Sequence, residues 1–284
     1  MLFHRRLQGA ASGGFDVGQR DPGAVRSPGR GEAGLTAKAT AQVGGTAPTM
    51  IRPLLPAAAR PLAWLLTACC AFIVAGLAVL FAPHTGLDWL DRSVDPQIQS
   101  MYQSQQDLLN RLGMPGNPIP VAVMIVAIAV ICLAIGRLNG ALLVAVAVPA
   151  ASAMAEHVLK PLVGRTAHGF LSYPSGHGTV MFALAAVLVV LMLPPPRARV
   201  LTLTLRLIVP VAAIALACDI SVIVIGLGVH YFTDTIAGAA LGIGTVAATA
   251  LVLDLPGARR WLAAANGRLH NLQIHRGREE ALRG

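Results

Sequence analysis

Six apolar stretches recur along the sequence, separated by shorter polar breaks. They cover residues 61–82, 119–136, 140–155, 178–193, 207–229 and 235–255. A helix of about 20 apolar residues crosses the hydrocarbon core of a membrane, and the third and fourth stretches are short unless they extend into their flanks. The pattern predicts an all-α fold, an integral membrane bundle of about six transmembrane helices.

A different pattern fills the longest connection, between the first two stretches. Val94, Ile98, Met101, Leu108 and Leu112 recur there at helical spacing among polar residues. Such spacing is typical of an amphipathic helix lying on the membrane surface. We therefore expect an amphipathic segment at the outer face, over residues 94–112.

The two ends of the chain have no apolar periodicity. Residues 1–50 are rich in Gly, Ala, Arg and Ser, which predicts a disordered basic tail, or a stretch upstream of a translation start at Met50. Residues 51–256 then form one membrane domain, and residues 257–284 a basic cytoplasmic tail.

Composition agrees with a membrane protein and argues against nucleic acid as a partner. Charged residues make up 12% of the chain and hydrophobic residues 55%, and the mean hydropathy is +0.65. The net charge of +9 comes mostly from Lys and Arg in the tails and beside the apolar stretches, where they favour anionic membrane lipids. The four cysteines all fall within apolar stretches, so they predict neither a disulfide framework nor a metal site.

The positions of the basic residues predict the orientation in the membrane. With a cytoplasmic N-terminus, the cytoplasmic side holds nine arginines near the stretch ends: Arg52, Arg60, Arg137, Arg197, Arg199, Arg206, Arg259, Arg260 and Arg268. The opposite side holds four basic residues: Arg92, Arg111, Lys160 and Arg165. This asymmetry predicts cytoplasmic termini in a plasma-membrane protein. The connections 156–177 and 228–234 then face the extracytoplasmic side.

These two connections have an unusual density of polar residues. Ser175 and Gly176 precede the fourth stretch, and a helix N-terminus with free N–H groups binds phosphate well. His230 and Asp234 lie four residues apart, so a helix places them on one face, where the carboxylate is able to orient the imidazole. Each residue alone also fits a helix cap, an interfacial salt bridge or a snorkelling side chain. Together they predict a functional site.

The same residues resemble three signature blocks of the type 2 phosphatidic acid phosphatase superfamily, which includes lipid phosphate phosphatases and vanadium haloperoxidases. The blocks are Lys160, the run Pro174-Ser175-Gly176-His177, and the pair His230 and Asp234. The resemblance covers roughly residues 156–240, and the predicted membrane bundle agrees with the integral-membrane branch of this family.

The resemblance implies a role for each residue of these blocks. His230 would be the catalytic nucleophile, oriented by Asp234, and His177 would protonate the leaving group. Lys160, Ser175 and Gly176 would hold the phosphate oxygens. Neither a cofactor nor a metal is implied.

Two arginines of the family pattern are absent from their usual places. The arginine seven residues after the lysine is replaced by Ala167, and the arginine six residues before the nucleophile by Val224. Arg165 lies two residues before the first of these places, and we expect its guanidinium to grip phosphate oxygens instead.

The expected activity is hydrolysis of a lipid phosphate or diphosphate at the outer leaflet, through a phosphohistidine. A lipid is favoured because the site lies at the depth of lipid head groups. Two alternatives stay open: a degenerate, non-catalytic relative that binds phospholipid, and a transporter centred on Asp219, an acidic residue within the fifth apolar stretch.

Single cysteines test the predicted orientation, in a chain whose own cysteines have been replaced. With Thr166→Cys, an impermeant thiol reagent should label intact cells, because residue 166 is predicted outside. With Arg199→Cys, labelling should require permeabilised cells. Labelling of intact cells at position 199 alone would overturn the orientation.

Overall fold

The computed structural model describes residues 53–82, 88–193, 203–265 and 267. Contacts divide the chain into Met1–Ala47 and Pro48–Gly284, and every described residue belongs to the second unit. The predicted disordered tail therefore lies outside the described residues, as does nearly all of the predicted C-terminal tail.

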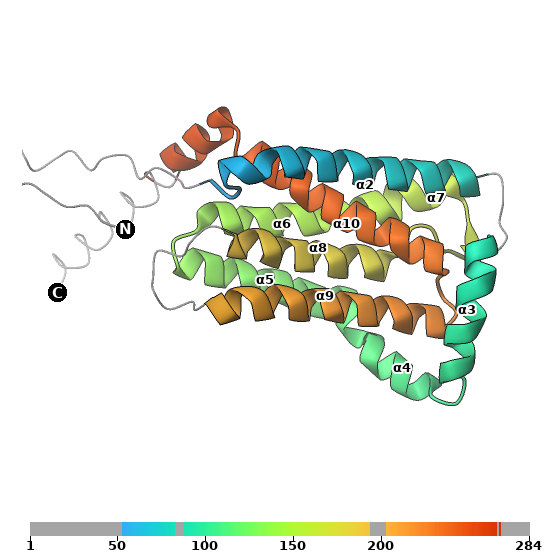
Figure 1. The fold of residues 1–284 in the computed structure, drawn as a ribbon. Coiled ribbons are helices and arrows are strands. Elements are labelled where there is room, and N and C mark those ends of the chain that lie inside the picture. The colour runs from blue at the N-terminus through green and yellow to red at the C-terminus, as the bar shows by residue number, and fades with distance from the viewer. Residues whose placement is uncertain (1–52, 83–87, 194–202, 266, 268–284) are drawn as a thin grey trace, which may run out of the picture. The chain divides into compact units, whose positions relative to one another are not determined.

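Six helices of the second unit run side by side as a bundle (Figure 1). They are α2 (Arg60–Phe81), α5 (Pro118–Ala134), α6 (Leu138–Ala153), α8 (Gly176–Met192), α9 (Leu203–Gly226) and α10 (Phe232–Leu253). Each starts and ends within a few residues of a predicted apolar stretch, which confirms the all-α membrane bundle.

Within the described residues, five apolar helical segments reach the usual length of a membrane span. These continuous helical segments are Ala57–Phe81, Gln106–Ala134, Leu138–Val163, Thr204–Gly226 and Phe232–Leu253. α8 is apolar but only 17 residues long, and it packs between the other helices with ten of its residues buried. The structure thus has five helices of spanning length and one short apolar helix, α8, and the expected number of about six spans stays a prediction.

The predicted amphipathic segment is two helices rather than one. α3 (Trp89–Tyr102) lies across one end of the bundle (Figure 1), and α4 (Gln106–Gly113) leads back through a short 3₁₀ turn (Met114–Gly116) to α5. Met101, Leu108 and Leu112 are exposed, as on a lipid-facing surface, but Asp91 and Asp95 of α3 are buried. α3 is therefore held against the bundle by acidic side chains as well as by apolar packing.

The connection between α6 and α8 begins with a π-helical turn (η3, Met154–Leu159) and a single α-helical turn (α7, Lys160–Val163). A two-stranded hairpin follows, with β1 (Thr166–Ala167) antiparallel to β2 (Phe170–Leu171). Its two turn residues, His168 and Gly169, have φ angles of 50° and 87°, the conformation that a two-residue hairpin of the common type requires. The hairpin therefore presents His168 at its tip.

Two glycines of α10 allow α8 and α10 to approach closely. A Cβ atom at Gly238 would lie 2.6 Å from the carbonyl oxygen of Ser175, and one at Gly242 would lie 2.3 Å from that of Thr179. Both distances are below the contact limit for carbon and oxygen. The glycines therefore hold the start of α8 against the first turns of α10, where the predicted catalytic residues lie.

Gly242→Ala should lower the midpoint of thermal unfolding in detergent. The added methyl group meets backbone atoms, which cannot rotate away, and overpacking of this kind costs about 1–3 kcal/mol. Gly76→Ala is the matched control, because a Cβ at Gly76 of α2 meets no atom within 4 Å. The control should unfold at or above the wild-type midpoint, since alanine favours the helix. Equal midpoints for the two variants would contradict the close approach.

Candidate active site

The two predicted site connections meet at one end of the bundle around a cavity of about 420 Å³. Its lining residues are Lys160, Ala167, His168, Phe170, Leu171, His177, Leu227, Gly228, Val229 and His230. The structure therefore brings together Lys160, His177 and His230, which are up to 70 residues apart in the sequence.

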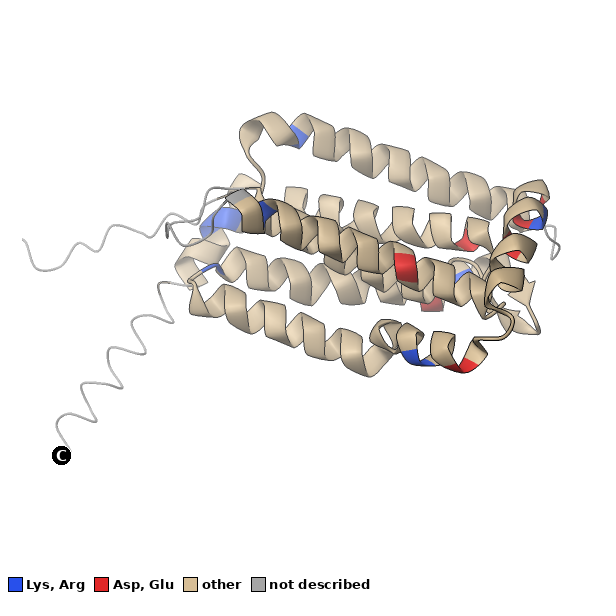
Figure 2. Cartoon of the chain, turned by 60° about the horizontal axis from the view of Figure 1, so that its bottom comes forward, with Lys and Arg blue, Asp and Glu red and all other residues tan. Residues whose placement is uncertain are grey.

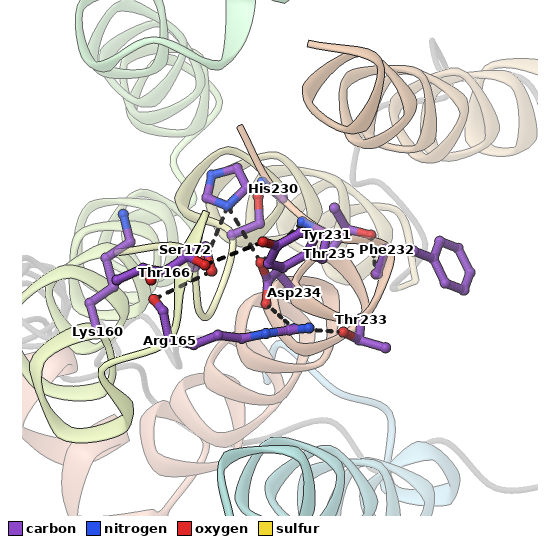
Figure 3. A network of polar contacts seen from close by, with 12 residues as sticks. Lys160, Arg165, Thr166, Ser172, His230, Tyr231, Phe232, Thr233, Asp234 and Thr235 are labelled. Carbon is purple, nitrogen blue, oxygen red and sulfur yellow. Dashed lines mark hydrogen bonds and ion pairs between the residues drawn. The ribbon is translucent and has the colours of Figure 1, made fainter. Parts of the chain in front are cut away.

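His230, between α9 and α10, has its ring held in one orientation. Its Nδ1 atom lies 2.9 Å from the carbonyl oxygen of Ser172 and 4.0 Å from Oδ2 of Asp234 (Figure 3). A carbonyl oxygen only accepts hydrogen bonds, so Nδ1 carries the proton and Nε2 is left with its lone pair. The predicted carboxylate partner is thus within ion-pair range, while the direct hydrogen bond is made by the backbone of Ser172.

The surroundings of His230 keep its imidazole neutral. The side chain is buried, and burial lowers its pKa, aided by the positive charge of Lys160 and by His177, to about 3. An unprotonated nitrogen at physiological pH is what a histidine nucleophile requires. The position therefore suits the predicted role of His230.

His177 stands in the first turn of α8 and also lines the cavity. Its ring centroid is 6.5 Å from that of His230, and its Nε2 atom lies 3.2 Å from Oδ1 of Asn117. A Cβ at Gly116 would lie 2.6 Å from the His177 ring, so the turn before α5 fits closely around it. Sequence reasoning missed Asn117, whose only signal is a polar residue at the start of an apolar stretch.

Ser175 and Gly176 begin α8 as predicted. The Ser175 hydroxyl accepts a hydrogen bond from the backbone N–H of Gly178 at 3.2 Å, which makes Ser175 a helix N-cap. Its own N–H donates to the carbonyl oxygen of Asp234 at 3.0 Å, which ties the second and third signature blocks together. Their role in phosphate binding stays a prediction.

Lys160 lies on the cavity wall and is paired with an acidic residue four positions before it. Its Nζ atom is 2.8 and 2.7 Å from the two carboxylate oxygens of Glu156. The positive charge predicted to bind phosphate is thus present in the cavity, with a carboxylate beside it.

Arg165 is not among the residues that line the cavity. Its side chain is fully buried, and Nη1 donates to Asp234 at 2.6 Å (Figure 3). Nη2 donates to Asp91 at 2.5 Å. Both ends of the guanidinium therefore bind carboxylates of the protein. The prediction that Arg165 grips phosphate needs correction, because the charge that would attract phosphate is already used within the fold.

Aromatic rings complete the surroundings of this guanidinium. Its central carbon lies 3.7 Å from the ring centroid of Phe81 in α2 and 4.4 Å from that of Tyr231. Cation–π attraction of this kind is strengthened where water is excluded. Arg165 thus links α2 and α3 to the N-terminus of α10.

Two aspartates of α3 cap α10 from outside the helix. Asp91 accepts a hydrogen bond from the backbone N–H of Thr233 at 2.9 Å, and Asp95 one from that of Phe232 at 3.1 Å. Negative charge is favourable there because the N–H groups of a first helical turn have no partner within the helix. Burial and the nearby charge of Asp91 raise the pKa of Asp95 to about 7. Their four-residue spacing was the signal that sequence reasoning missed.

The two places of the missing family arginines are apolar in the structure. Ala167 lines the cavity, and Val224 is 2% exposed. Asp219 is exposed on the outer surface of α9 and lines neither this cavity nor the apolar groove between α2 and α10. Its position gives no support to the alternative of a transporter centred on Asp219. Within the described ranges, no cluster of three or more His, Cys, Asp or Glu is arranged to hold a metal ion.

Arg165→Ala should destabilise the protein strongly, since it leaves the carboxylates of Asp91 and Asp234 buried without their cation. Breaking a buried ion pair in this way costs about 3–5 kcal/mol. Arg165→Lys keeps the charge but reaches one carboxylate at a time, so its stability should lie between those of the wild type and Arg165→Ala. Thermal unfolding in detergent measures both, with Arg111→Lys on the exposed surface of α4 as control. Wild-type stability with lost phosphate binding would restore the phosphate-gripping role.

Comparison with known proteins confirms the resemblance seen in the sequence. The PAP2 superfamily matches residues 121–256. Among solved structures, one similar fold is that of a transmembrane PAP2 type phosphatidylglycerolphosphate phosphatase from Bacillus subtilis, with a TM-score of 0.50 and 18% sequence identity. The match covers 62% of this chain and 92% of that chain. No curated protein sequence matches. The matched region contains all three signature blocks and the helices that carry them, and it supports the assignment of these residues to the PAP2 superfamily.

Proposed function

We propose that the protein is a membrane phosphatase that hydrolyses a lipid phosphate or diphosphate through a phosphohistidine on His230. The observation that carries the proposal is the state of this histidine. Its Nδ1–H is bound to the Ser172 carbonyl and its pKa is lowered to about 3, which leaves Nε2 unprotonated beside a cavity that also contains Lys160 and His177.

In the first step, Nε2 of His230 attacks the phosphorus and the bond to the leaving oxygen breaks. His177 donates a proton to that oxygen, so the alcohol or phosphate leaves in protonated form. The phosphorylated ring gains positive charge, and the carboxylate of Asp234, 4.0 Å from Nδ1, stabilises it. Asp234 therefore acts through its charge, while Ser172 fixes the orientation of the ring.

In the second step, a water molecule attacks the phosphorus and the bond to Nε2 breaks. His177, now unprotonated, accepts a proton from this water, which restores both histidines and releases inorganic phosphate. The covalent intermediate divides hydrolysis into two steps, each of which is easier than direct hydrolysis in one step. Lys160 and the first N–H groups of α8 stabilise the charge on the phosphoryl oxygens in both steps.

The position of the site supports a lipid substrate at the outer leaflet. The cavity lies at the bundle end where α8 and α10 begin, and the acidic residues lie mostly toward this end (Figure 2). The other end carries arginines at the helix termini: Arg60, Arg137, Arg206, Arg259 and Arg260. Excess positive charge on the cytoplasmic side then orients the cavity outward, at the depth of lipid head groups. The similar Bacillus subtilis structure is also described as acting on a lipid phosphate.

A second candidate is a relative that binds phosphorylated lipid without turnover, and the apolar residues Ala167 and Val224 favour it. A hydrogen bond between a charged donor and phosphate is worth about 1.5–3 kcal/mol, so two lost arginines reduce the rate by several orders of magnitude if nothing replaces them. Release of inorganic phosphate from a panel of lipid phosphates, by purified protein in mixed micelles, separates the two candidates.

Substitutions of the two histidines should separate their roles. His230→Ala should abolish both turnover and the covalent phosphoenzyme, because no other group takes its place as nucleophile. His177→Ala should lower turnover about 100- to 10,000-fold on esters of ordinary alcohols, the usual size of acid–base assistance. The loss of turnover in His177→Ala should be smaller on aryl phosphates, because their leaving groups need no proton. Equal losses on both substrate types would reject His177 as the acid.

A further inference from the structure

Glu156 of the π-helical turn η3 lies in the part of the site where phosphate is expected. Both of its carboxylate oxygens bind Nζ of Lys160, at 2.8 and 2.7 Å. The same carboxylate reaches the N-terminus of α8, because a Cβ built at Gly176 would lie 2.3 Å from Oε1 of Glu156. One anionic group therefore stands between a lysine and the first residue of a helix.

We propose that the Glu156 carboxylate occupies the subsite for the phosphoryl group, and that a substrate must displace it to bind. The inference rests on the proposed function, which assigns that subsite to Lys160 and the start of α8. A carboxylate and a phosphate present similar oxygen acceptors to an ammonium group and to helix N–H groups. Glu156 thus binds the lysine and lies against the helix start, the two groups that the proposed function assigns to phosphate.

Gly176 supplies the space for this contact. The 2.3 Å distance to Oε1 is far below van der Waals contact, so any side chain at position 176 would expel the carboxylate or be expelled. The absence of a side chain lets an oxygen of Glu156, or of a phosphate in its place, lie directly against the helix backbone.

The contact is also one that a ligand is able to break. The Glu156 side chain is 40% exposed, against 15% for Lys160, so the carboxylate has solvent to move into while the lysine remains in the cavity wall. An ion pair this exposed is weak, since water and salt screen it. π-helical turns are uncommon and occur frequently at functional sites, which fits a segment with such a role.

An internal anion lowers the apparent affinity for every phosphate ligand by the fraction of time it occupies the subsite. The same competition helps to release inorganic phosphate after hydrolysis, because Glu156 returns to Lys160 as the product leaves. Alternatively, Glu156 only orients Lys160 for the substrate. That role predicts weaker phosphate binding once the carboxylate is removed, whereas displacement predicts tighter binding. The direction of the change in phosphate affinity therefore distinguishes the two roles.

Titration calorimetry of inorganic phosphate into the purified full-length protein in detergent measures this sign without requiring turnover. Glu156→Gln, which keeps the shape and removes the charge, should lower the Kd for phosphate roughly fivefold, the factor that corresponds to an exposed ion pair of about 1 kcal/mol. Glu156→Asp, with a shorter reach, should fall between. Asp107→Asn is the matched control: it removes one negative charge from the exposed surface of α4 and should leave Kd unchanged.

The double variant Glu156→Gln with Lys160→Met should not show the tighter phosphate binding, because the Glu156 carboxylate and phosphate compete for this lysine. Unchanged or weaker phosphate binding by Glu156→Gln overturns the proposal, and so does a lack of phosphate binding by both wild type and variant. Tighter binding by the variant together with no hydrolysis of any lipid phosphate would uphold the role of Glu156 and reject the phosphatase. In an active enzyme, the inhibition constant of inorganic phosphate should fall by the same factor as Kd.

Discussion

The site depends on one buried interaction, the ion pairs that Arg165 makes with Asp91 and Asp234. A guanidinium with no exposure to solvent is tolerable only where carboxylates and aromatic rings replace its water, and here they come from α2, α3 and α10. The network fixes where α10 begins. Asp234 lies in the first turn of α10 and His230 just before it, so the position of the proposed nucleophile depends on Arg165, which does not line the cavity.

A second constraint is the close approach of α8 and α10. Gly238 and Gly242 bring the backbone of α10 against the carbonyl oxygens of Ser175 and Thr179, so the N-termini of two helices lie side by side. The first N–H groups of both helices have no partner within the helix, and they point toward the same end of the bundle. For α10 the aspartates of α3 satisfy these groups, whereas at α8 the Glu156 carboxylate lies against the first residue. The difference leaves α8, and not α10, available to an anion.

Together these constraints bear on how the proposed phosphatase would work with apolar residues at Ala167 and Val224. The positive charge of the site comes from Lys160 and from the dipole of α8, and the low pKa of His230 keeps the proposed nucleophile unprotonated. Glu156 moderates that charge until a stronger anion arrives. In the proposed mechanism, the buried ion pairs of Arg165 hold the geometry, while the exposed pair of Glu156 and Lys160 exchanges partners with the substrate.

The sequence by itself determined the membrane bundle and the three signature blocks. Apolar runs of sufficient length have only one stable environment, and each block lies within a short segment whose spacing is independent of the rest of the chain. It did not determine the role of Arg165 or the existence of its partner Asp91, 74 residues away. Nor did it reveal that Asn117 contacts His177. Isolated polar residues carry no periodic signal, and only the packing of α3 and α5 against α10 and α8 decides which carboxylate is buried with which cation. The tertiary structure thus assigned Arg165 to the fold rather than to phosphate, because a buried charge must satisfy the nearest opposite charges first.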